Sequence, residues 1–265
     1  MVSMFIAGIF VCCLARGITW MERRPPAMAE ELLARPILFL DGGLGTTLEE
    51  EHGVHFSSLT PLWSSHPLIS SPDMLLKTQT DFARAGADIL LTATYQASFD
   101  GFNRTPREPR HKDQGDDDRT GYSRAEATDY MRSAVSISRS AFREAGKPAG
   151  LVALSLGAYG ATMVPSQEYT GKYPVELTDS QGLYHFHLDR ITCFVEDENT
   201  WNNIDLVAFE TLPRLAEVRA VRMVMENVRK RGVSKEFWIS CVFPDSDELP
   251  DGSSISEVVT AMLSE

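Results

Sequence analysis

Apolar runs alternate with amphipathic stretches along the chain from residue 37 onward. Continuous apolar runs are typical of strands that are covered on both faces of a sheet, whereas apolar residues spaced three and four apart are typical of helices. The apolar runs predict strands at 37–40, 88–94, 151–156, 204–209 and 237–243. Helical spacing predicts helices at 72–85, 123–145, 183–198 and 255–263, with a further helix after residue 210.

Two of these helices carry recognisable end signals. Ser71 stands before a proline and an aspartate, the order expected for an N-cap, a first helical position and an acidic first turn, and Gly86 ends the segment. Ser123 and Glu126 have the spacing of a capping box. The signals agree with the periodicity and support these boundaries.

The repeated strand-then-helix order predicts an α/β fold with parallel strands and crossover helices. A doubly wound sheet and a (β/α)8 barrel both fit this order. Asp41, Thr94 and Glu210 stand at the C-terminal ends of three different predicted strands. In a barrel all strand ends meet at one mouth, whereas an open sheet concentrates its site at one switch point. We therefore predict a (β/α)8 TIM-barrel type fold, with about the first five βα units present, over residues 36–265.

Two segments do not fit the repeat. Residues 1–35 are expected to be an N-terminal extension outside the fold; their apolar part, 4–15, is too short to span a membrane and precedes the first basic residue, Arg16. An upstream extension, a targeting peptide and an anchor remain open for it. Residues 103–121 are polar and charged and predict a mobile loop. Its acidic run, 116–118, is read as a solvated insertion, with a metal site as the alternative.

Charge and cysteine usage narrow the class of function. The net charge is −12 and no dense run of basic residues occurs, which disfavours nucleic acid and anionic membranes as partners. The four cysteines form no CxxC pair and show no disulfide-like spacing. A small-molecule enzyme in the cytoplasm is the simplest interpretation.

The most informative polar stretch follows the first predicted strand. Asp41 ends that strand and a flexible turn containing Gly42 and Gly43 follows, which lets backbone N–H groups approach a ligand closely. A tight βα turn without a ligand is the alternative. The stretch does not match a dinucleotide fingerprint, because Leu48 stands at the last position. Glu210 is either a carboxylate for a substrate ammonium group or an acid at a helix N-terminus.

Four other residues invite a functional interpretation. Tyr159 could line a pocket or cap the barrel, and Cys241 is predicted to be a small buried hydrophobic residue. His185 and His187 are two positions apart on a predicted helix and face different directions, so we expect surface residues rather than metal ligands.

An ordered set of motifs then resembles the homocysteine S-methyltransferase family, most closely its members that use S-methylmethionine or S-adenosylmethionine. The set covers residues 36 to 265. It consists of Asp41-Gly42-Gly43-Leu44-Gly45-Thr46, Leu62-Trp63-Ser64, Ala85-Gly86-Ala87-Asp88, Thr94-Tyr95-Gln96-Ala97-Ser98, Ser155-Leu156-Gly157, Glu168-Tyr169-Thr170-Gly171 and Phe209-Glu210-Thr211.

The resemblance implies a (β/α)8 barrel and transfer of a methyl group from a sulfonium donor to homocysteine, giving methionine. It also implies that Asp41, Gly42, Thr94 and Glu210 bind the ammonium and carboxylate groups of homocysteine. These types of residue suit that role, because carboxylates accept from an ammonium group while N–H and hydroxyl groups donate to a carboxylate. Ala158 departs from the family pattern, which usually has proline there.

The family further implies zinc, bound by cysteines in a Gly-x-Asn-Cys motif and a Gly-Gly-Cys-Cys motif, which activates the homocysteine thiol. Neither motif occurs here, and Cys12-Cys13 precedes the predicted barrel and lacks the glycines. We therefore expect the zinc ligands to be absent, the chain to be C-terminally truncated, and its methyl transfer to be lost. The alternative is a non-catalytic homocysteine-binding or partner-binding fragment.

Overall fold

Four parallel strands form the centre of the structure and stand in the order in which they occur along the chain. The computed structural model describes residues 12–15, 35–57, 60–107, 121–244 and 247–263. The sheet has the order β1-β5-β4-β3-β2. The parallel strands are β2 (Ile89–Leu91), β3 (Leu151–Gly157), β4 (Leu206–Leu212) and β5 (Glu236–Cys241).

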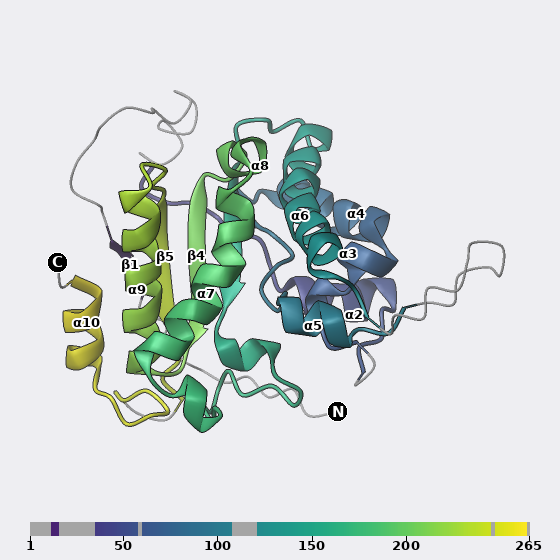
Figure 1. Ribbon diagram of the computed structural model, residues 1–265. Coiled ribbons are helices and arrows are strands. Elements are labelled where there is room, and N and C mark those ends of the chain that lie inside the picture. The colour runs from purple at the N-terminus through teal and green to yellow at the C-terminus, as the bar shows by residue number, and fades with distance from the viewer. Residues whose placement is uncertain (1–11, 16–34, 58–59, 108–120, 245–246, 264–265) are drawn as a thin grey trace.

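The long helices lie side by side in front of the sheet in Figure 1, also in chain order. They are α4 (Pro72–Ala85), α6 (Arg124–Glu144), α7 (Ser180–Val195) and α9 (Leu215–Lys230), with α10 (Ile255–Leu263) beyond α9. Sequential strand order with these helices on one face is the arrangement of a barrel wall. A doubly wound sheet would reverse its order and carry helices on both faces. The barrel-type prediction is confirmed.

Short elements occupy the connections. The short helices are α2 (Leu44–His52), α3 (Pro67–Ser70), α5 (Phe99–Arg104) and α8 (Glu198–Asn202). Three single 3-10 turns are η1 (Trp63–Ser65), η2 (Tyr159–Thr162) and η3 (Val175–Leu177). None of the described helices combines the length and the apolar character that a bilayer crossing requires.

The sheet buries apolar side chains on both faces. In β3, Val152 and Leu154 belong to the core between the sheet and the helices, whereas Leu151 and Ala153 belong to a second cluster. Side chains alternate between the two faces of a strand. Ser155 therefore lies on the face of the second cluster, which is the face opposite the helices. In β4, Leu206 and Ala208 belong to that same cluster. The same alternation puts Glu210, two residues after Ala208, on that face as well.

The prediction of a buried strand at 37–40 is wrong. Within the described residues, only Leu40 pairs there, as an isolated parallel bridge with Ile89. Ile37 is 65% exposed and Phe39 62% exposed. The apolar run borders β2 on one side, and no described strand lies on its other side. It therefore has no second strand to pair with, and its side chains are left uncovered. Sequence pattern cannot detect a missing neighbour.

The structure also differs from the prediction at two segments that were expected to lie outside the regular elements. Residues 1–35 were expected outside the fold, but β1 (Cys12–Ala15) pairs antiparallel with β5; residues 1–11 and 16–34 lie outside the described residues. The predicted loop 103–121 begins later, because Asn103 and Arg104 belong to α5 and Arg104 Nε donates to Asp100 over 2.7 Å. Residues 108–120, with the acidic run, lie outside the described residues.

The helix-end signals were largely correct. The Ser123 hydroxyl accepts from the N–H of Glu126, and the Glu126 carboxylate accepts from the N–H of Ser123, so α6 has the predicted capping box. Helix α4 spans the predicted residues, yet the Ser71 side chain makes no capping hydrogen bond. The flexible turn predicted after Asp41 is short, because α2 begins at Leu44.

Candidate functional site

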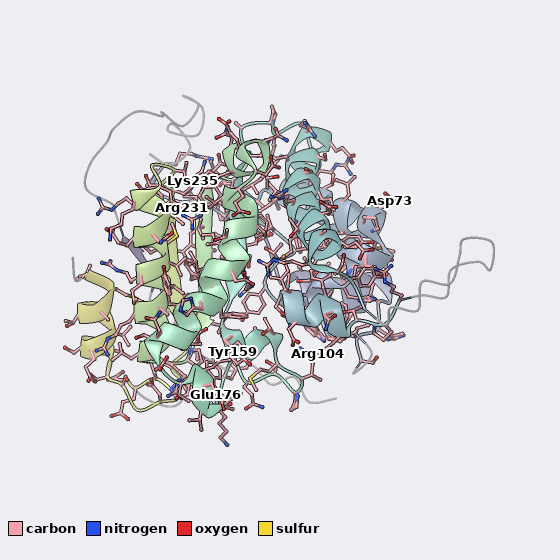
Figure 2. The ribbon with its side chains drawn as sticks, in the orientation of Figure 1. Asp73, Arg104, Tyr159, Glu176, Arg231 and Lys235 are labelled. Carbon is pink, nitrogen blue, oxygen red and sulfur yellow. The ribbon has the colours of Figure 1, made fainter. Side chains whose placement is uncertain are left out.

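The candidate site lies at the end of the molecule where the parallel strands finish. Figure 2 shows Tyr159, Arg104 and Glu176 at this end, and Arg231 and Lys235 at the opposite end. Tyr159 follows β3 and Lys235 precedes β5, so the two ends are the carboxyl and amino ends of the strands. Active sites of barrel enzymes lie at the carboxyl end.

Asp41 is anchored to the end of β2 through one side of its carboxylate. Its N–H donates to the carbonyl of Ile89 over 3.1 Å, and its Oδ2 accepts from the N–H of Leu91 over 2.9 Å. Oδ1 is buried and has no hydrogen-bond partner among the described residues. Burial raises the pKa of Asp41 to about 7, the charge of Glu210 adds to the rise, and the bond from Leu91 opposes it.

Glu210 faces the same site from β4. The Ser155 hydroxyl donates to its Oε2 over 2.8 Å, and burial raises its pKa to about 7 against that bond. The strand register shifts between Phe209 and Leu212, and Thr211 has φ of 62°. Such a backbone angle is strained for a β-branched residue and is concentrated at functional sites. Because β4 runs from Leu206 to Leu212, Glu210 lies inside this strand. The alternative that Glu210 is an acid at the N-terminus of the following helix is therefore wrong, since α9 begins at Leu215.

Thr94 bonds through its hydroxyl to Thr92 and Ser155 rather than to the two carboxylates. It is fully buried, its hydroxyl donates to the carbonyl of Ser155 over 2.7 Å, and it accepts from the hydroxyl of Thr92 over 2.7 Å. Thr92 in turn accepts from the N–H of Ser155. The structure thus brings Asp41 and Glu210 together and uses Thr94 to tie the end of β2 to β3. Its predicted contact with substrate stays a prediction.

Gly42 is exposed next to Asp41. A side chain there would place Cβ 2.9 Å from Cε1 of Phe82, which lies on α4. Because Gly42 is exposed and has no side chain of its own, its backbone is accessible to a ligand, as the glycine turn predicts.

Two residues at the site were not predicted to take part. The hydroxyl of Tyr95 donates to Oε2 of Glu168 over 2.6 Å and also contacts Thr211. Burial raises the pKa of both Tyr95 and Glu168 above its ordinary value. Both residues belong to motifs that carry the family resemblance, and their places in those motifs were the available signal. The sequence could not show that these two residues, 73 positions apart, are in contact.

The prediction that His187 is a surface residue is wrong. His187 is fully buried, and its Nε2 lies 2.9 Å from Oε1 of Glu217, which is also fully buried. Burial lowers the pKa of His187, so the ring is neutral near pH 7. His185 is exposed, as predicted. The two histidines do face different directions, and His187 lies on the buried face of α7, where Glu217 bonds to its Nε2.

The described residues do not fit a zinc site. No group of three or more His, Cys, Asp or Glu side chains among them is arranged to hold a metal ion. Cys193 and Cys241 are buried thiols, as predicted for Cys241. Burial raises the pKa of Cys193 to about 12, and its thiol donates to the carbonyl of Arg190. A protonated, buried thiol is a poor zinc ligand, because zinc binds thiolates.

A known protein family matches most of this chain. The family model described as Homocysteine S-methyltransferase covers residues 38–265. The chain belongs to the homocysteine S-methyltransferase family. The resemblance drawn from the sequence is thereby confirmed.

Relatives in this family span plants and bacteria. Homocysteine S-methyltransferase 4 of Zea mays is 31% identical over 228 residues, covering 82% of this chain and 59% of that protein. Selenocysteine Se-methyltransferase of Brassica oleracea var. italica is 31% identical over 234 residues, covering 83% of this chain and 60% of that protein. The chain thus spans about three fifths of the length of the curated relatives it matches.

A solved structure supports the same fold. The homocysteine methyltransferase MmuM from Escherichia coli, in its metallated form, aligns with a TM-score of 0.68 and 29% identity. The alignment covers 88% of this chain and 72% of that one. This homocysteine S-methyltransferase family chain therefore has the α/β architecture of a TIM-barrel enzyme.

Proposed function

We propose that this chain binds homocysteine and takes part in the transfer of a methyl group to it from a sulfonium donor, S-methylmethionine or S-adenosylmethionine, giving methionine. The observation that carries the proposal is the pair of half-buried carboxyl groups, Asp41 and Glu210, at the carboxyl end of a barrel wall in a chain of this family.

An ammonium group suits this pair. Both carboxyl groups have raised pKa values because burial disfavours their charge, and the two charges disfavour one another. A substrate ammonium supplies the missing counter-charge and donates three hydrogen bonds, one of which the unpartnered Oδ1 of Asp41 can accept. The N–H of Gly42 is the donor proposed for the substrate carboxylate. Thr94 contributes by holding Ser155, which orients Glu210.

Methyl transfer also requires a nucleophilic sulfur. A thiolate attacks the methyl carbon, the bond from that carbon to the sulfonium sulfur breaks, and a neutral thioether leaves. A free thiol has a pKa of about 8.5, so the homocysteine thiol must lose its proton first. The described residues offer no zinc ligands for that activation. We therefore assign to them the binding and orientation of homocysteine, and no part in activating the thiol.

Calorimetric titration with homocysteine tests the proposal directly. Wild type should bind, and D41N should raise the Kd about 10- to 100-fold, since it removes a charged hydrogen-bond acceptor. D81N is the matched control, because Asp81 is an exposed carboxylate on α4 paired with Lys77. No binding by folded wild-type protein, or equal losses in both variants, would overturn the proposal.

A methionine-formation assay with each sulfonium donor and added zinc then distinguishes the two proposed functions. Methionine production supports the methyltransferase. Binding of homocysteine without methionine formation supports the alternative, a non-catalytic homocysteine-binding chain.

We also propose a reducing, cytoplasmic location, which suits the buried thiols Cys193 and Cys241.

A further inference from the structure

Arg190 on α7 is a fully buried arginine that contacts the backbone at the ends of β2 and β3. Its Nη1 donates to the carbonyl of Gly157 over 2.8 Å. Its Nη2 donates to the carbonyls of Thr94 and Tyr95 over 3.1 and 3.0 Å. These carbonyls belong to the segments that leave β3 and β2, so one side chain holds the carboxyl ends of two neighbouring strands.

A buried carboxylate on α9 supplies the opposite charge. Glu217 is fully buried, and its charge interacts favourably with that of Arg190. Its Oε1 accepts from the N–H of Tyr159 over 2.6 Å, and its Oε2 accepts from the hydroxyl of Tyr173 over 2.7 Å. With His187, Glu217 therefore fixes the connection between β3 and α7 against α9.

The carbonyls that Arg190 holds are adjacent to the groups that orient Glu210. The N–H of Gly157 donates to the carbonyl of Tyr95, and the N–H of Ala158 donates to the carbonyl of Glu210. Ser155, two residues before Gly157, donates its hydroxyl to the Glu210 carboxylate. A displacement of the end of β3 would therefore move Glu210 and its partner together.

We propose that Arg190 is a positioning residue of the substrate site, with Glu217 as its buried counter-ion: it holds the ends of β2 and β3 at the spacing at which Asp41 and Glu210 receive one ammonium group. This inference rests on the proposed function. Arginine suits the task because its planar guanidinium presents several donors in fixed directions, which a lysine ammonium does not. The guanidinium also stacks near the Phe186 ring, with its carbon 5.1 Å from the centroid.

The chain contains a matched control at the opposite end of the same strands. Arg139 on α6 donates to the carbonyls of Asn203 and Gly150 over 2.8 and 2.9 Å and pairs with Asp205. Gly150 precedes β3 and Asp205 precedes β4. Arg139 thus performs the same kind of carbonyl bridging, but far along the strands from Asp41 and Glu210. Its replacement should affect stability without affecting the site.

The test compares R190K with R139K in the full chain, using hydrogen–deuterium exchange and homocysteine titration. R190K should speed exchange in peptides covering 94–98 and 157–163, while R139K should speed it near 150–152. R190K should also raise the Kd for homocysteine about tenfold or more, because small displacements of binding groups weaken productive contacts strongly. R139K should leave the Kd unchanged.

E217Q provides a second, nearly isosteric variant if R190K folds poorly. It should speed exchange in the same two segments and raise the Kd in the same direction. Exchange that rises uniformly along the chain in both R190K and E217Q, or a Kd that changes equally in R190K and R139K, would overturn the inference. If wild type fails to bind homocysteine, the proposed function fails, while the exchange pattern still decides whether Arg190 holds these strand ends.

Discussion

The candidate site is built on two carboxyl groups whose pKa values are raised by burial. Asp41 and Glu210 both have pKa values raised to about 7, from ordinary values of 3.8 and 4.5. Each carboxylate has one hydrogen-bonded oxygen, fixed by Leu91 and by Ser155 respectively. The site therefore combines a fixed geometry with an unmet requirement for positive charge.

The affinity for homocysteine should consequently rise with pH. An ammonium ligand favours the ionised carboxylates, so binding below pH 7 releases protons, and the Kd should fall about tenfold per pH unit for each proton released. Titration calorimetry in buffers of different ionisation enthalpy measures both quantities. In D41N the number of released protons should drop by up to one. A Kd independent of pH between 5 and 7 would contradict this assignment.

The same groups set the sign of a stability effect. A carboxyl group with a raised pKa in the folded state binds more protons there than in the unfolded state. Its stabilising contribution is therefore fully present below about pH 4 and is lost as pH rises through about 7. In the absence of ligand, the free energy of unfolding of wild type should fall relative to D41N over that range.

At the scale of elements, local signals and tertiary contacts contribute separately. Helix α6 starts with a complete capping box, whereas α4 starts at a serine whose side chain makes no capping bond. Serine precedes each helix, but only Ser123 is followed three residues later by a glutamate, whereas Met74 stands at that position after Ser71.

S123A should accordingly destabilise the protein, and S71A should not. Loss of an N-cap hydrogen bond costs about 1 kcal/mol, within a range of about 0.5–2 kcal/mol. Urea unfolding of the two variants measures the difference. Equal effects in S123A and S71A would show that the capping box of α6 contributes nothing beyond local propensity.

At the scale of the whole molecule, the sheet and its helices share one large core. Phe209 of β4 is fully buried in it, with its ring centroid 5.7 Å from that of His187 on α7 and 6.4 Å from that of Phe237 on β5. The same strand carries Glu210 on its next position. Packing at Phe209 therefore connects the stability of the barrel wall to the placement of the site.

F209A should destabilise the protein by about 3–5 kcal/mol, because it leaves a cavity where a large aromatic side chain was packed. M223A on α9 is the control, since Met223 is 42% exposed and its truncation should change the free energy of unfolding little. Urea unfolding gives both values. A loss below about 1 kcal/mol in F209A would mean that the core is not packed around this ring.

The sequence by itself determined most of the strand and helix order, the bounds of α4 and the capping box of α6, and it proposed Asp41 and Glu210 as candidate site residues. These features depend on residues close together in the chain, through periodicity, capping and the position at which an apolar run stops. The barrel type could also be predicted, because sequential parallel strands leave few alternatives. Family motifs added the roles proposed for Gly42 and Thr94.

Only the tertiary structure decided the features that depend on distant neighbours. It buried Arg190 and His187, where the carbonyls at the ends of β2 and β3 accept from Arg190 and Glu217 bonds to Nε2 of His187. It exposed Ile37, because no described strand covers that side of β2. It raised the pKa values of Asp41 and Glu210, because burial and proximity act across the fold. Burial and charge are properties of assembled neighbours, and a residue's own position in the chain does not specify them.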